Sequence, residues 1–230
     1  MSGDDRVLWI TGASSGIGAA TARLAAEEGW SLVLSARTEE NLEALAAELG
    51  EDHVVPHPCD VTDWEQQQSA VEAACEQFGR LDAVFANAGF GAERSFLGDT
   101  PEHWREMVLT NVYGAALTIR ASVPALKESK GHLLLTGSVA GRRPIVGSLY
   151  SATKHAVHAM AEALRQELDG TGVRVTVIAP GITDTAFFAS LPLDEALESE
   201  DIARAVMFAL SQPPRVDVNE ILVRPTAQAL

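Results

Sequence analysis

Tyr150 and Lys154 stand four residues apart in the run Tyr-Ser-Ala-Thr-Lys, and Ser138 precedes them by one short loop. On a helix this spacing places two side chains on one face. An ammonium beside a phenol favours the phenolate, which predicts a tyrosine pKa lowered toward neutrality. Such an acid/base suits a reaction in which a proton moves while a hydride reaches a carbonyl carbon. Most Tyr–Lys pairs at this spacing are ordinary surface neighbours, so the interpretation depends on the rest of the chain.

A glycine-rich turn near the amino terminus supplies a second, independent signal. The segment Thr11–Gly18 reads TGASSGIG, follows the apolar run Val7–Ile10 and precedes an alanine-rich stretch with good helix propensity. A strand, a glycine turn and a helix in this order typically hold a dinucleotide pyrophosphate at the helix N-terminus. Gly12 would allow the tight turn, Gly16 the approach of the pyrophosphate, and Gly18 the close packing of helix on strand.

Together these motifs resemble the short-chain dehydrogenase/reductase family, and the resemblance extends over nearly the whole chain. The matching segments, in the family's order, are the TGASSGIG turn, Asp60-Val61, Asn87-Ala88-Gly89, Asn111, Ser138, Tyr150, Lys154, and Pro180-Gly181 followed by Thr185. The family's fold, cofactor and chemistry are therefore the expectations for this chain.

The resemblance implies a role for each of four catalytic residues. Tyr150 would give a proton to the carbonyl oxygen as hydride arrives, or take one during alcohol oxidation. Lys154 would lower the tyrosine pKa and hydrogen-bond the nicotinamide ribose, and Ser138 would hold the substrate oxygen. Asn111 would support a water-linked proton path to Lys154.

The same signals predict the residues that hold a nicotinamide dinucleotide. They are Gly12, Ser14, Ser15, Gly16, Ile17, Gly18, Arg37, Thr38, Asp60, Val61, Asn87, Ala88, Gly89, Tyr150, Lys154, Pro180, Gly181, Thr183 and Thr185. Asp60 and Val61 would contact the adenine, and the Pro180–Thr185 segment would line the nicotinamide pocket.

The residues after the second expected strand indicate which nicotinamide cofactor is used. An NAD-binding chain usually has an acidic residue there for the ribose 2′-hydroxyl, but this chain has Ala36. Arg37 follows at once, and a guanidinium suits a 2′-phosphate. The sequence therefore predicts NADP(H) in preference to NAD(H). The alternative is that Arg37 simply points into solvent.

Two details depart from the family pattern. The interval from Ser138 to Tyr150 is one residue shorter than usual, so we expect altered substrate contacts in the loop 139–149. Thr183 stands where the PG-x-V-x-T segment has valine. We expect that change to be tolerated, because the family uses the backbone of this residue to contact the nicotinamide amide.

Apolar runs alternate with helix-forming stretches along the chain. The expected strands are Val7–Ile10, Ser31–Ser35, His53–Pro56, Leu81–Ala86, His132–Thr136, Arg174–Ile178 and Glu220–Val223. The expected helices are Ala19–Glu28, Glu39–Leu49, Trp64–Phe78, Pro101–Leu126, Ser151–Leu168 and Asp201–Leu210, with Thr100 as a cap and Ser199 or Glu200 opening the last. This order predicts an α/β chain with a single Rossmann-type, doubly wound parallel sheet of about seven strands and helices on both faces.

Length and composition agree with that fold class. The chain has 230 residues, 47% of them hydrophobic, which favours one domain over 1–230. The formal net charge of −15 argues against nucleic acid as a partner, because phosphate binding needs clustered Lys and Arg. No apolar run reaches the about 18 residues of a membrane span. The amino terminus lacks a signal-peptide pattern, and Cys59 and Cys75 have no ligand-like spacing, so we expect free thiols, no metal and a cytoplasmic location.

The acidic, lysine-poor composition has two explanations that stay open. One is a salt-rich cytoplasm, which would make the protein halophilic. The other is a GC-rich genome combined with ordinary solubility needs. Lys127, Lys130 and Lys154 are the chain's only lysines.

The sequence indicates the identity of the substrate less clearly than the type of reaction. By resemblance the short stretch 186–198 forms a substrate lid, which favours an open pocket. Candidates for an apolar wall are Phe90, Phe187 and Phe188, and candidates for meeting a carboxylate are Arg94, Arg142 and Arg143; core packing and solvated surface are the alternatives. The run 218–226 resembles the branch that contains NADP-dependent 3-hydroxy-acid and serine dehydrogenases. The resemblance implies an aldehyde, ketone or small hydroxy acid.

Two further features have less specific interpretations. His155, His158 and Glu162 share a helical face and could hold a metal, although a solvated or subunit-facing position is the simpler interpretation. By resemblance, the helices predicted over Pro101–Leu126 and Ser151–Leu168 would join copies of the chain into a dimer or tetramer.

Other functions are compatible with the fold. A protein of this kind can bind NADP(H) as a non-catalytic sensor or regulator, but such proteins typically lose the tyrosine or the lysine. Epimerisation or dehydration through an oxidised intermediate occurs in related, longer chains that have a separate substrate domain. The retained Ser138, Tyr150 and Lys154 favour an oxidoreductase.

Overall fold

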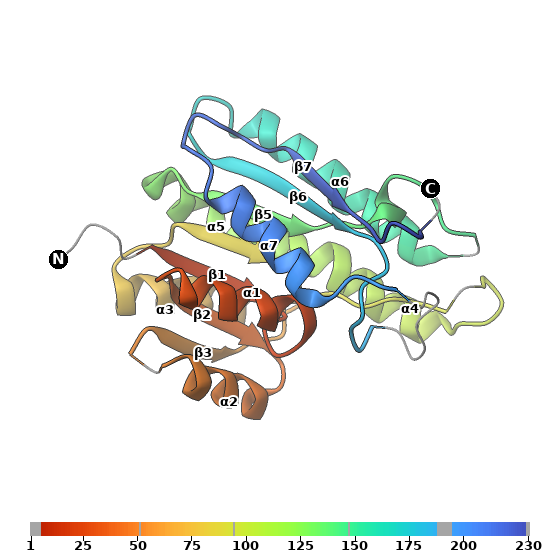
Figure 1. Cartoon of the computed structure of the whole chain (residues 1–230), viewed down its shortest axis with the longest axis horizontal. Helices are drawn as coiled ribbons and strands as arrows, with labels where there is room; N and C mark the ends of the chain where they lie inside the picture. Colours follow the sequence, from red (N-terminus) through yellow and green to blue (C-terminus); the bar gives the residue numbers. More distant parts are fainter. Residues whose placement is uncertain (1–5, 51, 94, 147, 188–194, 229–230) are drawn as a thin grey trace.

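Seven parallel strands form one sheet with helices around it, as Figure 1 shows. The structure, a computed structural model, describes residues 6–50, 52–93, 95–146, 148–187 and 195–228. The strands are β1 (Val7–Thr11), β2 (Ser31–Ala36), β3 (Val54–Pro58), β4 (Ala83–Ala86), β5 (His132–Thr136), β6 (Arg174–Pro180) and β7 (Glu220–Val223). Their order is β3-β2-β1-β4-β5-β6-β7, so the direction of winding reverses between β1 and β4. The predicted Rossmann-type α/β fold is confirmed.

Helices cover both faces of this sheet. They are α1 (Gly16–Glu27), α2 (Glu39–Leu49), α3 (Trp64–Phe78), α4 (Pro101–Val108), α5 (Ala115–Ser129), α6 (Leu149–Glu167) and α7 (Ser199–Leu210). Side chains alternate across a strand, so Leu8 and Ile10 of β1 pack with α1, α2 and α7, whereas Val7 and Trp9 pack with α3, α5 and α6. Both faces are thus buried, as parallel sheets require.

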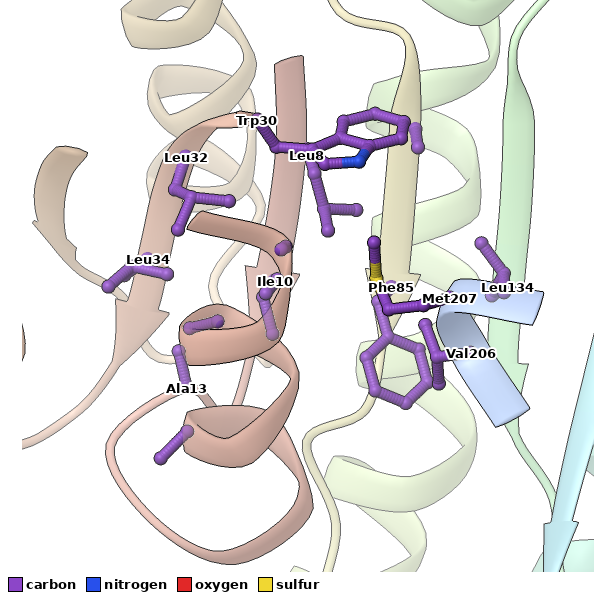
Figure 2. Packing of buried hydrophobic residues seen from close by; sticks show 14 of the residues in the cluster. Leu8, Ile10, Ala13, Trp30, Leu32, Leu34, Phe85, Leu134, Val206 and Met207 are labelled. Carbon is purple, nitrogen blue, oxygen red and sulfur yellow. The ribbon is translucent and has the colours of Figure 1, made fainter. Parts of the chain in front are cut away.

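Figure 2 shows the core under α1 and α7. Val206 and Met207 of α7 reach Phe85 of β4, beside Leu134 of β5. Burying side chains of this size contributes about 1.5–3 kcal/mol each. The result is a rigid support for the loops at the carboxyl ends of β1, β4 and β5.

The long helix predicted over Pro101–Leu126 is interrupted. It begins as expected, because the Thr100 hydroxyl accepts the His103 N–H at 3.1 Å. Between α4 and α5, however, Leu109–Gly114 form a π-helical turn, and α5 continues to Ser129. Such wide turns occur inside helices at functional sites. Helix propensity does not distinguish them from α-helix, which explains why the prediction was wrong here.

Other boundaries differ by a few residues. Helix α6 begins at Leu149, so Tyr150 lies in its first turn, and α1 begins at Gly16 inside the glycine motif. Helix α7 begins at Ser199, with Glu198 and Asp201 forming a reciprocal capping box. Strand β6 continues to Pro180, which brings the Pro180-Gly181 segment to the sheet edge.

Candidate active site

A cavity of about 730 Å³ lies where the carboxyl ends of the strands meet. Ligands of doubly wound sheets bind at this edge, beside the point where the strand order reverses. Every predicted site residue except Gly18 and Asn111 lines this one cavity. Segments that are far apart in the sequence are therefore brought together as the motif order predicted.

The glycine turn has the conformation that the sequence requires. Gly12 and Gly16 have φ of +66° and +51°, a region that other residues rarely adopt. Gly18 has no room for a side chain, because a Cβ there would stand 2.2 Å from the Gly12 carbonyl oxygen. The Ser15 side chain makes no capping hydrogen bond to α1, so the first N–H groups of the helix remain available to an anion.

The loop after β4 is fastened to the glycine turn. The Thr11 hydroxyl accepts the N–H groups of Asn87 and Ala88 at 3.0 and 3.1 Å. The Asn87 amide donates to the Thr11 carbonyl at 3.2 Å, and its oxygen accepts the Thr136 hydroxyl at 3.0 Å. These bonds join the ends of β1, β4 and β5 into one surface against which a dinucleotide can lie.

Tyr150 and Lys154 project from one face of α6 into the cavity, and Ser138 faces them from the loop after β5. The Lys154 ammonium stands 5.6 Å from the centre of the Tyr150 ring and donates to the Thr136 carbonyl at 2.7 Å. The Ser138 hydroxyl accepts the Ala140 N–H at 3.1 Å and hydrogen-bonds Tyr150. A phenol, a hydroxyl and an ammonium thus converge on one point.

Burial shifts the pKa of both ionisable groups toward the neutral form. It raises the pKa of Tyr150 to about 12, and the hydrogen bond from Ser138 opposes the rise. It lowers the pKa of Lys154 to about 8. The sequence predicted a lowered tyrosine pKa, so that expectation is wrong for the cofactor-free protein, because desolvation of the phenolate outweighs the hydrogen bond.

Asn111 lies behind this centre, not on the cavity wall. It belongs to the π-helical turn and is buried. Its amide donates to the Phe90 carbonyl at 2.8 Å and to the Thr153 hydroxyl at 3.2 Å, and its oxygen accepts the Phe90 N–H at 3.0 Å. The wide turn directs the amide to the loop after β4 and to α6, so Asn111 joins the two.

Comparison with known proteins agrees with this geometry. The family model described as short chain dehydrogenase matches residues 6–196. The chain belongs to the short-chain dehydrogenase family. It is 43% identical over 225 residues to an uncharacterized oxidoreductase of Staphylococcus aureus, covering 96% of this chain and 97% of the relative. We therefore describe it as an oxidoreductase of this family.

Two solved structures are similar over almost their whole length. An alcohol dehydrogenase from Thermococcus sibiricus, complexed with 5-hydroxy-NADP, has a TM-score of 0.91 and 34% identity, with 99% of each chain covered. Serine dehydrogenase from Escherichia coli has a TM-score of 0.88 and 30% identity, covering 97% of this chain and all of that one. The glycine turn of this short-chain dehydrogenase fits a nicotinamide dinucleotide as well, because the first N–H groups of α1 are open to the cavity.

The residues predicted to choose the cofactor all line the cavity. They are Arg37 and Thr38, which follow Ala36 at the end of β2, and Asp60 and Val61, which follow β3. Thr38 is the N-cap of α2, and its side chain makes no capping hydrogen bond to the first N–H groups of the helix. Within the described residues, no group of three or more His, Cys, Asp or Glu is placed to hold a metal ion.

The substrate end combines apolar and basic side chains. Phe187 packs edge-to-face on the Tyr150 ring at 5.3 Å between ring centres, and Phe90 lines the same end. Arg142 is bound by Glu220, whereas the exposed Arg143 lines the cavity mouth. Phe188 and Arg94 lie outside the described residues.

The sequence did not identify several residues that complete the site. The Thr136 carbonyl fixes Lys154, and the Gln228 side chain accepts the Ile182 N–H at 2.9 Å, beside the nicotinamide segment. His158 is buried against the loop that carries Ser138, not on a solvated or subunit-facing surface as the sequence predicted. No short-range pattern signals these contacts, because the partners are 18 to 46 residues apart or meet only through the fold.

Proposed function

We propose that this protein transfers a hydride between NADP(H) and a carbonyl or secondary alcohol, with Tyr150 as the acid/base. One observation carries the proposal: Ser138, Tyr150 and Lys154 converge in the cavity that also contains the dinucleotide-binding turn. We also propose that residues 1–230 are a single domain that works in the cytoplasm. The free thiols Cys59 and Cys75 support a reducing compartment.

Each side chain has a distinct task in the proposed reaction. A bound nicotinamide supplies or accepts the hydride. The Tyr150 hydroxyl is protonated at neutral pH and donates its proton to the substrate oxygen during reduction. Ser138 holds that oxygen, and Lys154 places a positive charge near it while contacting the cofactor ribose. Phe187 packs edge-to-face on the Tyr150 ring and holds its orientation.

Arg37→Ala should weaken NADPH binding about tenfold or more and change NADH binding little. The guanidinium makes a charge-assisted contact that only the 2′-phosphate offers. The measurement is the dissociation constant of each dinucleotide, followed by quenching of tryptophan fluorescence. Arg105→Ala, an exposed arginine on α4, is the matched control. An equal loss for NADPH and NADH would refute the proposed preference.

We propose that substrates include small hydroxy acids and their oxo forms, with Arg143 meeting the carboxylate. Of the two adjacent lining arginines, Arg142 is neutralised by Glu220, whereas no ion pair is found for Arg143 among the described residues. Arg143→Ala should raise KM for 3-hydroxybutyrate about tenfold and leave KM for its methyl ester unchanged, since the ester lacks the charge. Steady-state kinetics on both substrates checks this. A parallel rise for the ester would contradict the assignment.

The first experiment is a spectrophotometric assay of NADPH with aldehydes, ketones, diketones and 3-oxo esters, and of NADP⁺ with hydroxy acids. Turnover with one cofactor consumed per product supports a reductase. Tight NADPH binding without turnover favours the alternative, a sensor of the cofactor. Turnover without net cofactor change would favour epimerisation or dehydration.

Assembly of this chain into a homo-oligomer is a further part of the proposal. Val108, Leu109 and Tyr113 are exposed apolar or aromatic side chains along α4 and the π-helical turn. A surface of this kind is typical of a subunit interface. Among the described residues, no helix is both long enough and apolar enough to pass through a bilayer.

A further inference from the structure

The His158 imidazole fills the space beneath the segment Gly137–Arg143, which we call the serine loop. His158 lies on α6 one turn beyond Lys154 and is only 6% exposed. A Cβ on Gly137 would stand 2.5 Å from its Nε2, and a Cβ on Gly141 would stand 2.5 Å from its Cδ2. Neither glycine has positive φ, so both positions need glycine for space and not for backbone conformation. The ring and the two glycines that flank Ser138 therefore fit one another.

A second contact fastens the far end of the serine loop. The Arg142 guanidinium forms a two-pronged ion pair with Glu220 of β7, with Nε to Oε1 at 2.9 Å. Bidentate pairs of this kind fix direction as well as distance. The same Glu220 oxygen stands 3.8 Å from His158 Nδ1. Strand β7, helix α6 and the serine loop thus meet at one carboxylate.

Burial disfavours the charged form of the His158 imidazole. Burial lowers the pKa of His158 and outweighs the attraction of Glu220 and of the Ser138 backbone, while Arg142 and His155 act in the same direction as burial. The contact with the Ser138 backbone is not a well-formed hydrogen bond, because neither ring nitrogen has a partner at ordinary hydrogen-bond geometry among the described residues. The close fit of the ring against Gly137 and Gly141, and not a strong hydrogen bond, is what places His158 at this site.

We propose that His158 is a positioning residue which, together with the Arg142–Glu220 pair, holds the serine loop so that the Ser138 hydroxyl stays against Tyr150. The inference rests on the proposed function, because it assigns His158 a part in the same hydride transfer. His158 does not line the cavity and acts only through Ser138. A displacement of about 1 Å in such a group is enough to lower turnover by up to about 100-fold.

The test is a double-mutant cycle. His158→Ala should lower kcat about tenfold while the dissociation constant of NADPH stays within about twofold. In a Ser138→Ala background the same change should cost no more than about twofold, because the group it positions is gone. Glu220→Gln keeps the shape of the side chain and removes its charge, and it should show the same pattern with a smaller loss. This variant also decides the question where His158→Ala does not fold.

The control is His155→Ala, an exposed histidine on the same helix, which should leave kcat unchanged. A full tenfold loss that persists in the Ser138→Ala background would overturn the proposal, as would no loss at all. Hydrogen exchange of the cofactor-bound protein gives a readout that needs no turnover. In His158→Ala, amide exchange that is about tenfold faster than in wild type at residues 138–143 alone supports the positioning role, even if no carbonyl is reduced. Unchanged exchange, or faster exchange throughout, overturns it.

Discussion

Tyr150→Phe should lower turnover about 1000-fold and leave NADPH binding within about twofold. The substitution removes one hydroxyl from a ring whose packing against Phe187 is unchanged, so the cavity keeps its shape. A positioned proton donor contributes a factor of about 100 to 10,000 in rate. The measurement is kcat for the best carbonyl substrate, with the NADPH dissociation constant determined on the same preparation.

Tyr113→Phe is the matched control, because Tyr113 is the chain's other tyrosine and is exposed on the π-helical turn. It should retain full turnover. Retention of turnover by Tyr150→Phe would instead remove the tyrosine from the mechanism. It would leave Ser138 or a water molecule as the proton donor.

The raised pKa of Tyr150 predicts different pH dependences for carbonyl reduction and alcohol oxidation by the wild-type protein. With a pKa of about 12, the Tyr150 hydroxyl keeps its proton across the neutral range, which is the form that carbonyl reduction requires. Alcohol oxidation requires the phenolate, so its rate should rise with pH while the reduction rate stays flat between pH 6 and 8. The two directions therefore have different pH profiles, both of which Tyr150→Phe abolishes.

The fold and the meeting of the motif residues in one cavity were predictable because their signals are local. A strand, a glycine turn and a helix lie within the segment 7–27, and Tyr150 and Lys154 share one turn of helix. The glycine motif and the Tyr–Lys pair are both defined by short sequence spacings, which can be recognised without knowing the tertiary structure. The positive φ of Gly12 and Gly16 and the absence of space at Gly18 are the physical reasons behind the motif letters.

The support of the site was not predictable in the same way. The π-helical turn at Asn111, the burial of His158 and the bond from Gln228 to Ile182 all depend on partners that the fold brings close. The sequence around His158 gives no sign that its side chain is buried. The burial becomes visible only when the fold brings Gly137 and Gly141 against the ring. The tyrosine pKa was mispredicted for a related reason, since the sequence shows the neighbouring charge but not the loss of water.

Lys154→Met should abolish most turnover and, in the same protein, remove a pH-dependent part of the stability. The ammonium is buried, and its pKa is about 8 in the folded protein against an unfolded value of 10.5. Between these values the unfolded chain binds a proton that the folded protein has released, so the free energy of unfolding rises with pH. A shift of one pKa unit corresponds to about 1.36 kcal/mol, which predicts a wild-type gain of about 2 kcal/mol from pH 8 to pH 10 relative to the variant.

Below pH 8 the charged form of Lys154 lowers the free energy of unfolding, and it is this charged form that the proposed mechanism uses beside Tyr150 and the ribose. Denaturant unfolding of the cofactor-free proteins at pH 7, 8, 9 and 10 measures the difference, with Lys127→Met on the exposed face of α5 as control. A difference between wild type and Lys154→Met that does not change with pH would show that the ammonium is solvated. In that case the bond to the Thr136 carbonyl, and not the buried charge, would be the contribution of Lys154 to the folded structure.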